Sequence, residues 1–168
     1  MIELRPSVSQ DLPDLLGWVS SEAEMVLWSG PKFSWPLHVE QLDVYLAESR
    51  AGTRLVWTAS DSFSKTPVGH VSLAFQDNGK TGRLGRVLVA PKARHAGHGR
   101  AVTQAAVTAG FNESGIDAMT LGVYRHNTIA RHLYEQLGFK TTAIVENSVT
   151  VNGEPWDNIE MRLPRHRT

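Results

Sequence analysis

The sequence VLVAPKARHAGHGRA, residues 87–101, decides the fold of this 168-residue chain. An apolar run ends at Pro91, and a basic segment with two glycines, Gly97 and Gly99, leads into a stretch rich in alanine. This pattern predicts a buried strand, a tight turn and a helix that begins near Gly97. The first N–H groups of a helix have no acceptor within the helix and lie at the positive end of its dipole. The turn therefore predicts a binding site for an anion such as phosphate.

Two features of this turn favour a phosphate ligand, although neither is specific by itself. Gly97 and Gly99 let a phosphate approach the backbone closely, and three cations add positive charge: Lys92, Arg94 and Arg100. The same glycines could simply ease a corner between strand and helix, because short glycine motifs are common. A dinucleotide-binding site or a Walker loop fits less well, since the chain has no third glycine at the required spacing and no Gly-Lys-Ser/Thr here. A nucleotide-binding module is kept as a weaker use of the same turn.

The composition indicates one soluble globular domain. Hydrophobic residues make up 41% of the chain and charged residues 20%, which is ordinary globular usage. Lysine and arginine together number 17, as do aspartate and glutamate, so neither nucleic acid nor a membrane surface is an expected partner. The absence of cysteine excludes a thiolate nucleophile and any cysteine-ligated metal. No signal peptide and no apolar run of membrane-spanning length is evident, so a cytoplasmic protein is expected.

The order of predicted elements indicates an α/β (α+β) fold, with a mixed, mostly antiparallel sheet and helices on both faces. Strands are predicted at residues 2–5, 55–59, 68–75, 84–89, 119–124, 139–151 and 156–163. Helices are predicted from an N-cap at Ser9 through Val19, and over residues 38–50, 97–112 and 127–137, whereas residues 28–36 have loop composition. The order β-α-α-β-β-β-α-β-α-β-β places antiparallel hairpins before a parallel crossover, within a single domain of residues 1–168.

Two blocks of the sequence together resemble the GNAT superfamily of acyl-CoA-dependent N-acyltransferases. Arg94-x-x-Gly97-x-Gly99, after a Val-x-Val-x-Pro strand, is similar to the loop with which that family binds acyl-CoA pyrophosphate. The second block, LGVYRHNTIARHLYEQLGF over residues 121–139, lies in the family's order and at its separation. The resemblance implies a GNAT-like fold and an N-acetyltransferase that moves the acetyl group of acetyl-CoA directly to a primary amine in a ternary complex. The amine would belong to a small molecule or a protein N-terminus, and a homodimer is left open.

The resemblance also implies which residues bind the cofactor: Val87, Leu88, Val89, Arg94, His95, Ala96, Gly97, His98, Gly99, Arg100, Asn127, Ala130 and Tyr134. The resemblance implies that the strand at residues 84–89 offers a backbone N–H that polarises the acetyl carbonyl, as in an oxyanion hole, and we expect Leu88 to be the donor. Tyr134 is implied to act as general acid toward the CoA thiolate, although helical tyrosines are commonly packing residues. Asn127 is implied to contact the pantetheine arm or the adjacent ribose-phosphate region, and it is equally a good N-cap for the next helix.

The sequence does not identify the general base. Many members of the family carry a glutamate on the central strand shortly before a Gly-Arg pair, but residues 81–86 read TGRLGR. Candidate substitutes are Glu22, Glu24, His70 and Asp77, and of these Glu22 and His70 join Tyr134 as the expected catalytic residues; a bound water is a further option. Each also has a structural explanation, as solvated surface, strand histidine or turn former. The missing carboxylate motivates an alternative function, a non-catalytic acyl-CoA-binding sensor or regulatory module.

Four histidines and three aromatic residues have roles that the motifs do not fix. The histidines lack the i,i+4 helical pairing and the carboxylate partners of a metal site, so no metal is expected; they are His95, His98, His126 and His132. Trp28, Phe33 and Trp35 lie among glycine, proline and serine. They could wall an acceptor pocket or close a small core beneath a long loop.

Overall fold

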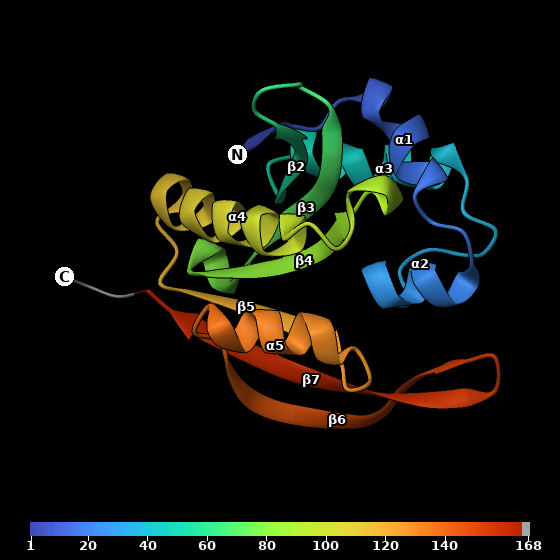
Figure 1. Ribbon diagram of the computed structural model, residues 1–168. Helices are drawn as coiled ribbons and strands as arrows, with labels where there is room; N and C mark the ends of the chain where they lie inside the picture. Colours follow the sequence, from blue (N-terminus) through green and yellow to red (C-terminus); the bar gives the residue numbers. More distant parts are fainter. Residues whose placement is uncertain (166–168) are drawn as a thin grey trace.

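Seven strands form a single sheet in the computed structural model, which describes residues 1–165 and, within them, the side chains of all but residues 113 and 114. The strand order is β1-β2-β3-β4-β5-β7-β6 (Figure 1). The strands are β1 (Ile2–Pro6), β2 (Arg54–Asp61), β3 (Pro67–Gln76), β4 (Thr81–Val89), β5 (Ala118–Tyr124), β6 (Lys140–Val151) and β7 (Glu154–Pro164). Every neighbouring pair is antiparallel except β4 and β5, which are parallel. The predicted mixed, mostly antiparallel sheet is therefore confirmed.

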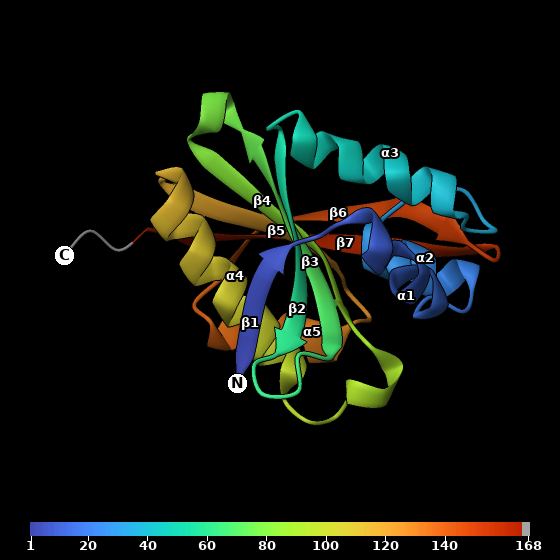
Figure 2. The same ribbon diagram turned by 90° about the horizontal axis from the view of Figure 1, so that it is seen from above.

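Helices cover the two faces of the sheet (Figure 2). One face carries α1 (Leu12–Gly17), α2 (Glu22–Ser29) and α3 (Val39–Arg50), and the other carries α4 (His98–Ser114) and α5 (Thr128–Gln136). Each face has its own apolar cluster, one containing Leu42 and Tyr45 of α3, the other containing Val102 and Ala106 of α4. Burying these side chains against the sheet fixes both helix layers relative to the strands.

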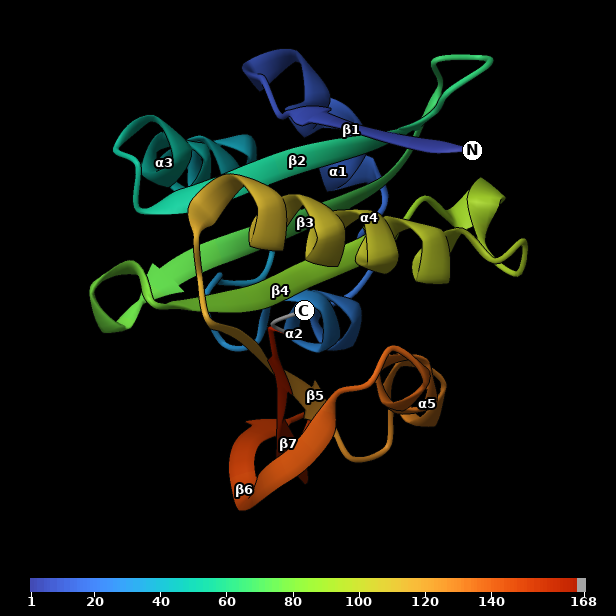
Figure 3. The same ribbon diagram turned by 90° about the vertical axis from the view of Figure 1, so that its left-hand side faces the viewer.

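The decisive feature of the sheet is the separation of β4 from β5. The two strands pair over only three positions, Thr81 with Ala118, Gly82 with Met119 and Arg83 with Thr120. Beyond them β5 continues beside β7, and the two halves of the sheet diverge (Figure 3). A bulge in β4 coincides with this divergence, since the register with β3 shifts there and Arg86 has a positive φ of 52°. Bulges increase local twist and redirect a strand, so β4 leaves the sheet with one edge unpaired.

The N-terminal helices differ from the prediction. Residues 22–29 form α2, although part of this segment has loop composition, so three helices rather than two precede β2. Ser21 caps α2 by accepting a hydrogen bond from the Glu24 N–H at 3.1 Å. The predicted cap at Ser9 is wrong, because Ser9 lies within a short 3-10 helix, Ser9–Asp11, that precedes α1.

The remaining predicted elements are confirmed within a few residues at their ends. The turns follow the expected chemistry, since Asn78 and Asn152 adopt left-handed φ values of 54° and 51°. Gly138, with φ of 95°, ends α5 as predicted. Within the described part of the chain, no helix combines the length and the apolar character needed to cross a membrane.

Candidate active site

A cavity of about 480 Å³ opens where β4 and β5 part, on the face covered by α4 and α5. Its walls are the unpaired edge of β4, the turn into α4, the facing side of β5 and the start of α5. Of the residues predicted to bind cofactor, the following line it: Val87, Val89, Arg94, His95, Gly97, His98, Gly99, Arg100, Asn127, Ala130 and Tyr134. Leu88 and Ala96 do not. The sequence reasoning missed several apolar wall residues, such as Leu84, Leu121 and Leu133, because their pattern is that of ordinary core residues.

The N-terminus of α4 presents free backbone donors to this cavity. Gly97 precedes the helix in a left-handed conformation with φ of 77°, and no side chain caps the helix. The first recorded helical bond runs from the Ala101 N–H to the Gly97 carbonyl at 3.2 Å, so the amides of residues 97–100 have no acceptor among the described residues. With the dipole of a 17-residue helix behind them, these amides form an anion site.

Side-chain contacts hold the turn in place around those amides. Arg94 donates from Nε to the Val89 carbonyl at 3.2 Å and lies 3.5 Å from Glu24 of α2. Arg100 donates to Gln136 at 2.8 Å. This bond joins the start of α4 to the end of α5. The turn is therefore fixed from both sides of the cavity, and a ligand meets a preformed cradle.

The edge of β4 facing the cavity offers further backbone donors, but not the one predicted. The Ala90 N–H bonds to the Val68 carbonyl at 2.9 Å, and the pairing continues with Leu88 opposite His70. Because hydrogen-bonding directions alternate along an antiparallel strand, Leu88 directs its N–H toward β3. The neighbouring amides, those of Val87 and Val89, face the gap instead. The expectation that Leu88 supplies the oxyanion donor is thus corrected by the register.

Tyr134 projects from α5 into the cavity with its hydroxyl free. Its ring packs edge-on against Phe139, with the centroids 6.0 Å apart, and no hydrogen bond to its oxygen occurs among the described residues. Burial raises the pKa of Tyr134 to about 12. The phenol therefore keeps its proton at physiological pH and can serve as a hydrogen-bond donor to a ligand atom.

Asn127 begins α5 and lines the same cavity. Its side-chain oxygen accepts a hydrogen bond from the Ala130 N–H at 3.3 Å, so the capping role predicted from the sequence is confirmed. The side-chain N–H₂ donates no hydrogen bond to any of the described residues, so it is available to donate to a ligand.

A second cavity, of about 410 Å³, lies on the side of the gap covered by the N-terminal helices. Residues 30–32 after α2, the end of β5 and the β6–β7 hairpin form its rim. Both cavities share six wall residues: Leu27, Trp28, Leu84, Gly85, Arg86 and Gly122. The two cavities therefore meet through the opening between β4 and β5, and ligands entering from opposite faces would come into contact there.

A model of the acetyltransferase (GNAT) family matches residues 22–139, more than two thirds of the chain. The chain belongs to this family. It is an acetyl-CoA-dependent N-acetyltransferase, which transfers an acetyl group to an amine.

Solved structures share the whole fold of this acetyltransferase. A spermidine N-acetyltransferase from Vibrio cholerae, in complex with CoA and spermine, superimposes with a TM-score of 0.85 at 19% identity, covering 97% of this chain and 95% of that chain. The N152L mutant of the Vibrio cholerae enzyme gives a TM-score of 0.81 at 19% identity, with 97% and 93% covered. At this identity the likeness establishes the fold, and it leaves the acceptor of the present acetyltransferase open.

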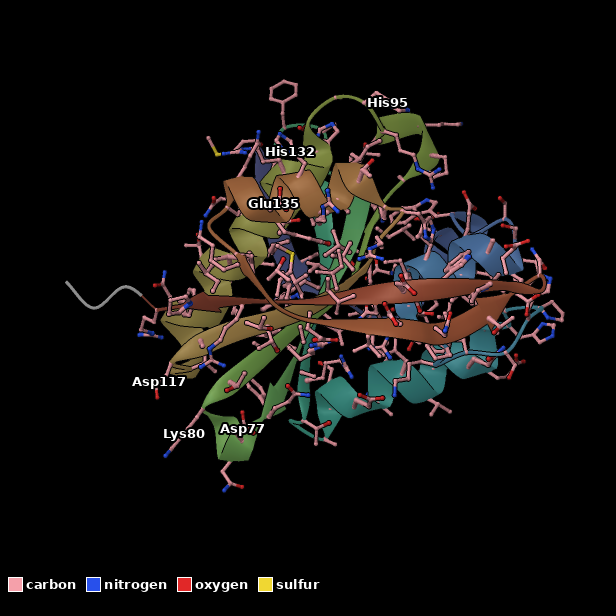
Figure 4. The ribbon with its side chains drawn as sticks, turned by 90° about the horizontal axis from the view of Figure 1, so that it is seen from below. Asp77, Lys80, His95, Asp117, His132 and Glu135 are labelled. Atoms are coloured by element: carbon pink, nitrogen blue, oxygen red, sulfur yellow. The ribbon has the colours of Figure 1, made fainter. Side chains whose placement is uncertain are left out.

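None of the four candidate bases, Glu22, Glu24, His70 and Asp77, lines either cavity. Glu22 is exposed at the start of α2, and Asp77 lies in the β3–β4 turn, at the end of the molecule opposite His95 (Figure 4). Glu24 lines neither cavity, and hydrogen bonds from Ser20 lower the pKa of its carboxyl. His70 is 3% exposed, and burial lowers its pKa to about 3.

His70 belongs to the packing beneath α3. Its Nε2 lies 2.9 Å from the Tyr45 hydroxyl, and it also contacts the edge of Trp28. The imidazole is neutral and surrounded by rings, and it lines neither cavity at the gap between β4 and β5. The sequence pattern of a strand histidine cannot distinguish this position from a site on the cavity wall.

The three aromatic residues of the N-terminal segment have separate roles. Trp28 lines both cavities and donates from its indole N–H to the Arg86 carbonyl at 2.9 Å, which ties α2 to the β4 bulge. Phe33 stacks on Trp28 with the ring centroids 5.6 Å apart and lines neither cavity. Trp35 is 40% exposed and also lies outside both. The sequence left open whether these three residues line a pocket or close a small core. Among the three, only Trp28 does both.

Proposed function

We propose that this enzyme binds acetyl-CoA and a primary amine together and transfers the acetyl group directly between them. The observation that carries the proposal is the meeting of the two cavities at Gly85 and Arg86 of β4 and Gly122 of β5. Acetyl-CoA occupies the 480 Å³ cavity and the amine enters through the 410 Å³ cavity. Holding both reactants at one opening supplies much of the rate through proximity.

The pyrophosphate of acetyl-CoA lies on the amides of residues 97–100, with Arg94 and Arg100 beside it. The pantetheine arm then follows the unpaired edge of β4, where the backbone groups of Val87 and Val89 face the cavity. The same edge donates an N–H to the acetyl carbonyl oxygen, which stabilises the negative charge that develops there during attack. Asn127 adds a side-chain donor at the opposite wall.

The transfer is a single displacement through a tetrahedral intermediate. The amine nitrogen attacks the acetyl carbon, a carbon–nitrogen bond forms, and the carbon–sulfur bond breaks to release CoA thiolate. Tyr134 donates to that thiolate, because burial keeps its phenol protonated. No cysteine exists to carry the acetyl group, which agrees with direct attack.

The amine loses its proton to water in this proposal. Glu160 is the carboxylate that lines the acceptor cavity, and both of its oxygens are already bonded. Arg83 binds the two oxygens, and Asn158 donates to Oε1 at 2.7 Å. Both oxygens of this carboxylate are therefore engaged by protein donors rather than free for the amine.

Steady-state kinetics test the proposal. CoA thiol release is measured while acetyl-CoA and an amine are varied together, and the acetylated amine is identified by mass spectrometry. Intersecting double-reciprocal lines are expected for a ternary complex, whereas parallel lines would contradict direct transfer. Calorimetric binding of acetyl-CoA without thiol release on a broad amine panel would instead favour a sensor.

A further inference from the structure

We propose that the acceptor amine also carries an oxyanion, a carboxylate or a phosphate-type group, which is bound by Arg86, Arg54 and Lys32 in the 410 Å³ cavity. The inference rests on the proposed function, because it assumes that this cavity receives the amine. It separates the present acceptor in chemistry from a polyamine, which bears only positive charge.

The charges around the acceptor cavity are strongly unbalanced. Four cationic side chains line it, Lys32, Arg54, Arg83 and Arg86, against the one carboxylate of Glu160. Arg83 and Glu160 neutralise each other in a two-pronged ion pair. Arg54 is paired with Glu48, which lies outside the cavity, so the cations without an ion pair among the described residues are Lys32 and Arg86. These two charges leave the cavity net positive, which attracts an anionic ligand and disfavours a polycation.

Arg86 is the centre of this field. Its guanidinium carbon lies 4.3 Å from the centroid of the Tyr45 ring and 5.5 Å from that of Phe33. Its Nε is buried without a hydrogen-bond partner, and no carboxylate pairs with it among the described residues. Partial burial of a cation without an anionic partner costs free energy. A bound oxyanion would supply that partner and offset the cost.

A second guanidinium increases that cost. Arg54 lies over the same Tyr45 ring at 5.6 Å. Burial is the main cause of the lowered pKa of Arg86, and repulsion from Arg54 adds to it, whereas Tyr45 and Glu48 act in the opposite direction. Arg54 is held by Glu48 at 2.7 Å and by Ser72 at 3.3 Å, so its orientation is fixed. An oxyanion near both guanidiniums would relieve their repulsion, and the planar forks of arginine suit such a ligand.

The position of Arg86 also limits the acceptor's size. Arg86 directly follows Gly85, which lines both cavities and has nothing within 4 Å of the place a Cβ would occupy. Because Arg86 itself lines both cavities, we expect a short linker between the oxyanion and the amine of the acceptor. Amino acids and aminoalkyl phosphonates have this separation between amine and anion.

Matched acceptors test the inference through thiol release and mass spectrometry of the product. One set pairs each α-amino acid with the amine left after removal of its carboxylate; a second set compares β-alanine, 2-aminoethylphosphonate and ethylamine; spermidine completes the panel. We expect kcat/KM at least tenfold higher for the anionic member of the best pair. The ratio of β-alanine to the phosphonate identifies which oxyanion the site prefers. Equal or better turnover of the partners without an oxyanion, or of spermidine, would overturn the inference and leave the transferase intact.

Variants separate the charge effect from loss of structure. Lys32 is exposed, so Lys32→Glu should fold normally, and we expect kcat/KM for anionic acceptors to fall threefold or more relative to kcat/KM for ethylamine. Arg86→Met should give a larger loss of the same selectivity, with thermal unfolding reporting its stability. Lys80→Glu is the control, since Lys80 lies in the β3–β4 turn away from both cavities (Figure 4).

A binding measurement keeps the two proposals distinguishable. N-acetylated amino acids are titrated calorimetrically into the wild-type protein and Lys32→Glu, each with CoA bound. Tighter binding by the wild type supports the anion site even without turnover, whereas equal affinities contradict it. Absence of thiol release on every amine, with acetyl-CoA bound, would reject the transferase proposal.

Discussion

Replacing Tyr134 by phenylalanine removes the proposed general acid without disturbing the fold. The hydroxyl has no partner among the described residues, and the ring is held by its contact with Phe139, so the substitution removes one oxygen and no protein hydrogen bond. Stability and acetyl-CoA affinity should therefore change little. Loss of a general acid lowers turnover by about 100-fold or more, and 100-fold corresponds to roughly 2.7 kcal/mol of transition-state stabilisation.

The assay compares kcat for thiol release with the Kd for acetyl-CoA from calorimetry and with urea unfolding. Tyr45→Phe is the matched control, because its hydroxyl lies 2.9 Å from His70 Nε2 in the buried packing beneath α3. That variant should lose about 1–2 kcal/mol of stability, since a buried hydrogen bond is broken, without a comparable loss in kcat. The reasoning about Tyr134 is refuted if Tyr134→Phe retains wild-type turnover, or if its losses follow unfolding as they do for Tyr45→Phe.

Three further predictions concern pH and the cofactor turn. In the pH profile, kcat/KM for the amine should rise until the amine is deprotonated and show no fall from Tyr134 below about pH 11, since its pKa is about 12; a descending limb near pH 8 that disappears in Tyr134→Phe would contradict this. Burial lowers the pKa of His70 to about 3, so below pH 6.5 this imidazole is protonated in the unfolded chain but stays neutral in the folded chain. The free energy of unfolding therefore falls as the pH drops below 6.5. At pH 5 the loss is about 2 kcal/mol, measurable by urea unfolding, and an unchanged stability from pH 7 to 5 would be inconsistent with the buried neutral imidazole. Gly97→Ala should cost about 1 kcal/mol of stability, because alanine is strained at the φ of 77° that this residue adopts. The added methyl group would project into the open space proposed for the pyrophosphate, so acetyl-CoA binding should weaken several-fold. An acetyl-CoA affinity equal to that of the wild type, measured by calorimetry, would show that the turn tolerates a side chain.

The sequence predicted the strand–turn–helix at residues 87–101 because each local signal there agrees. The apolar run, Pro91 and the glycines all favour the same break, and no tertiary contact opposes it. The predicted loop at residues 28–36 overlaps the end of α2, because Trp28 lies among serine, glycine and proline. Glu22, Ala23 and Met25 favour a helix and Ser21 caps it, but the segment is short. The bond from the Trp28 indole to the Arg86 carbonyl of β4 also supports α2, and such a long-range contact leaves no local signal.

The sequence by itself therefore determined the order of helices and strands along the chain, the turn into α4 and half of the residues that line the 480 Å³ cavity. Only the tertiary structure decided the direction of the Leu88 amide, the burial of His70 and the gathering of four cations around the acceptor cavity. The physical reason is that each of these depends on a register, a bulge or a layer of packing that joins distant segments. Hydrophobic periodicity and turn residues depend on neighbours along the chain. The electrostatic field at a side chain and its exposure to solvent depend instead on the residues that pack around it in the folded protein.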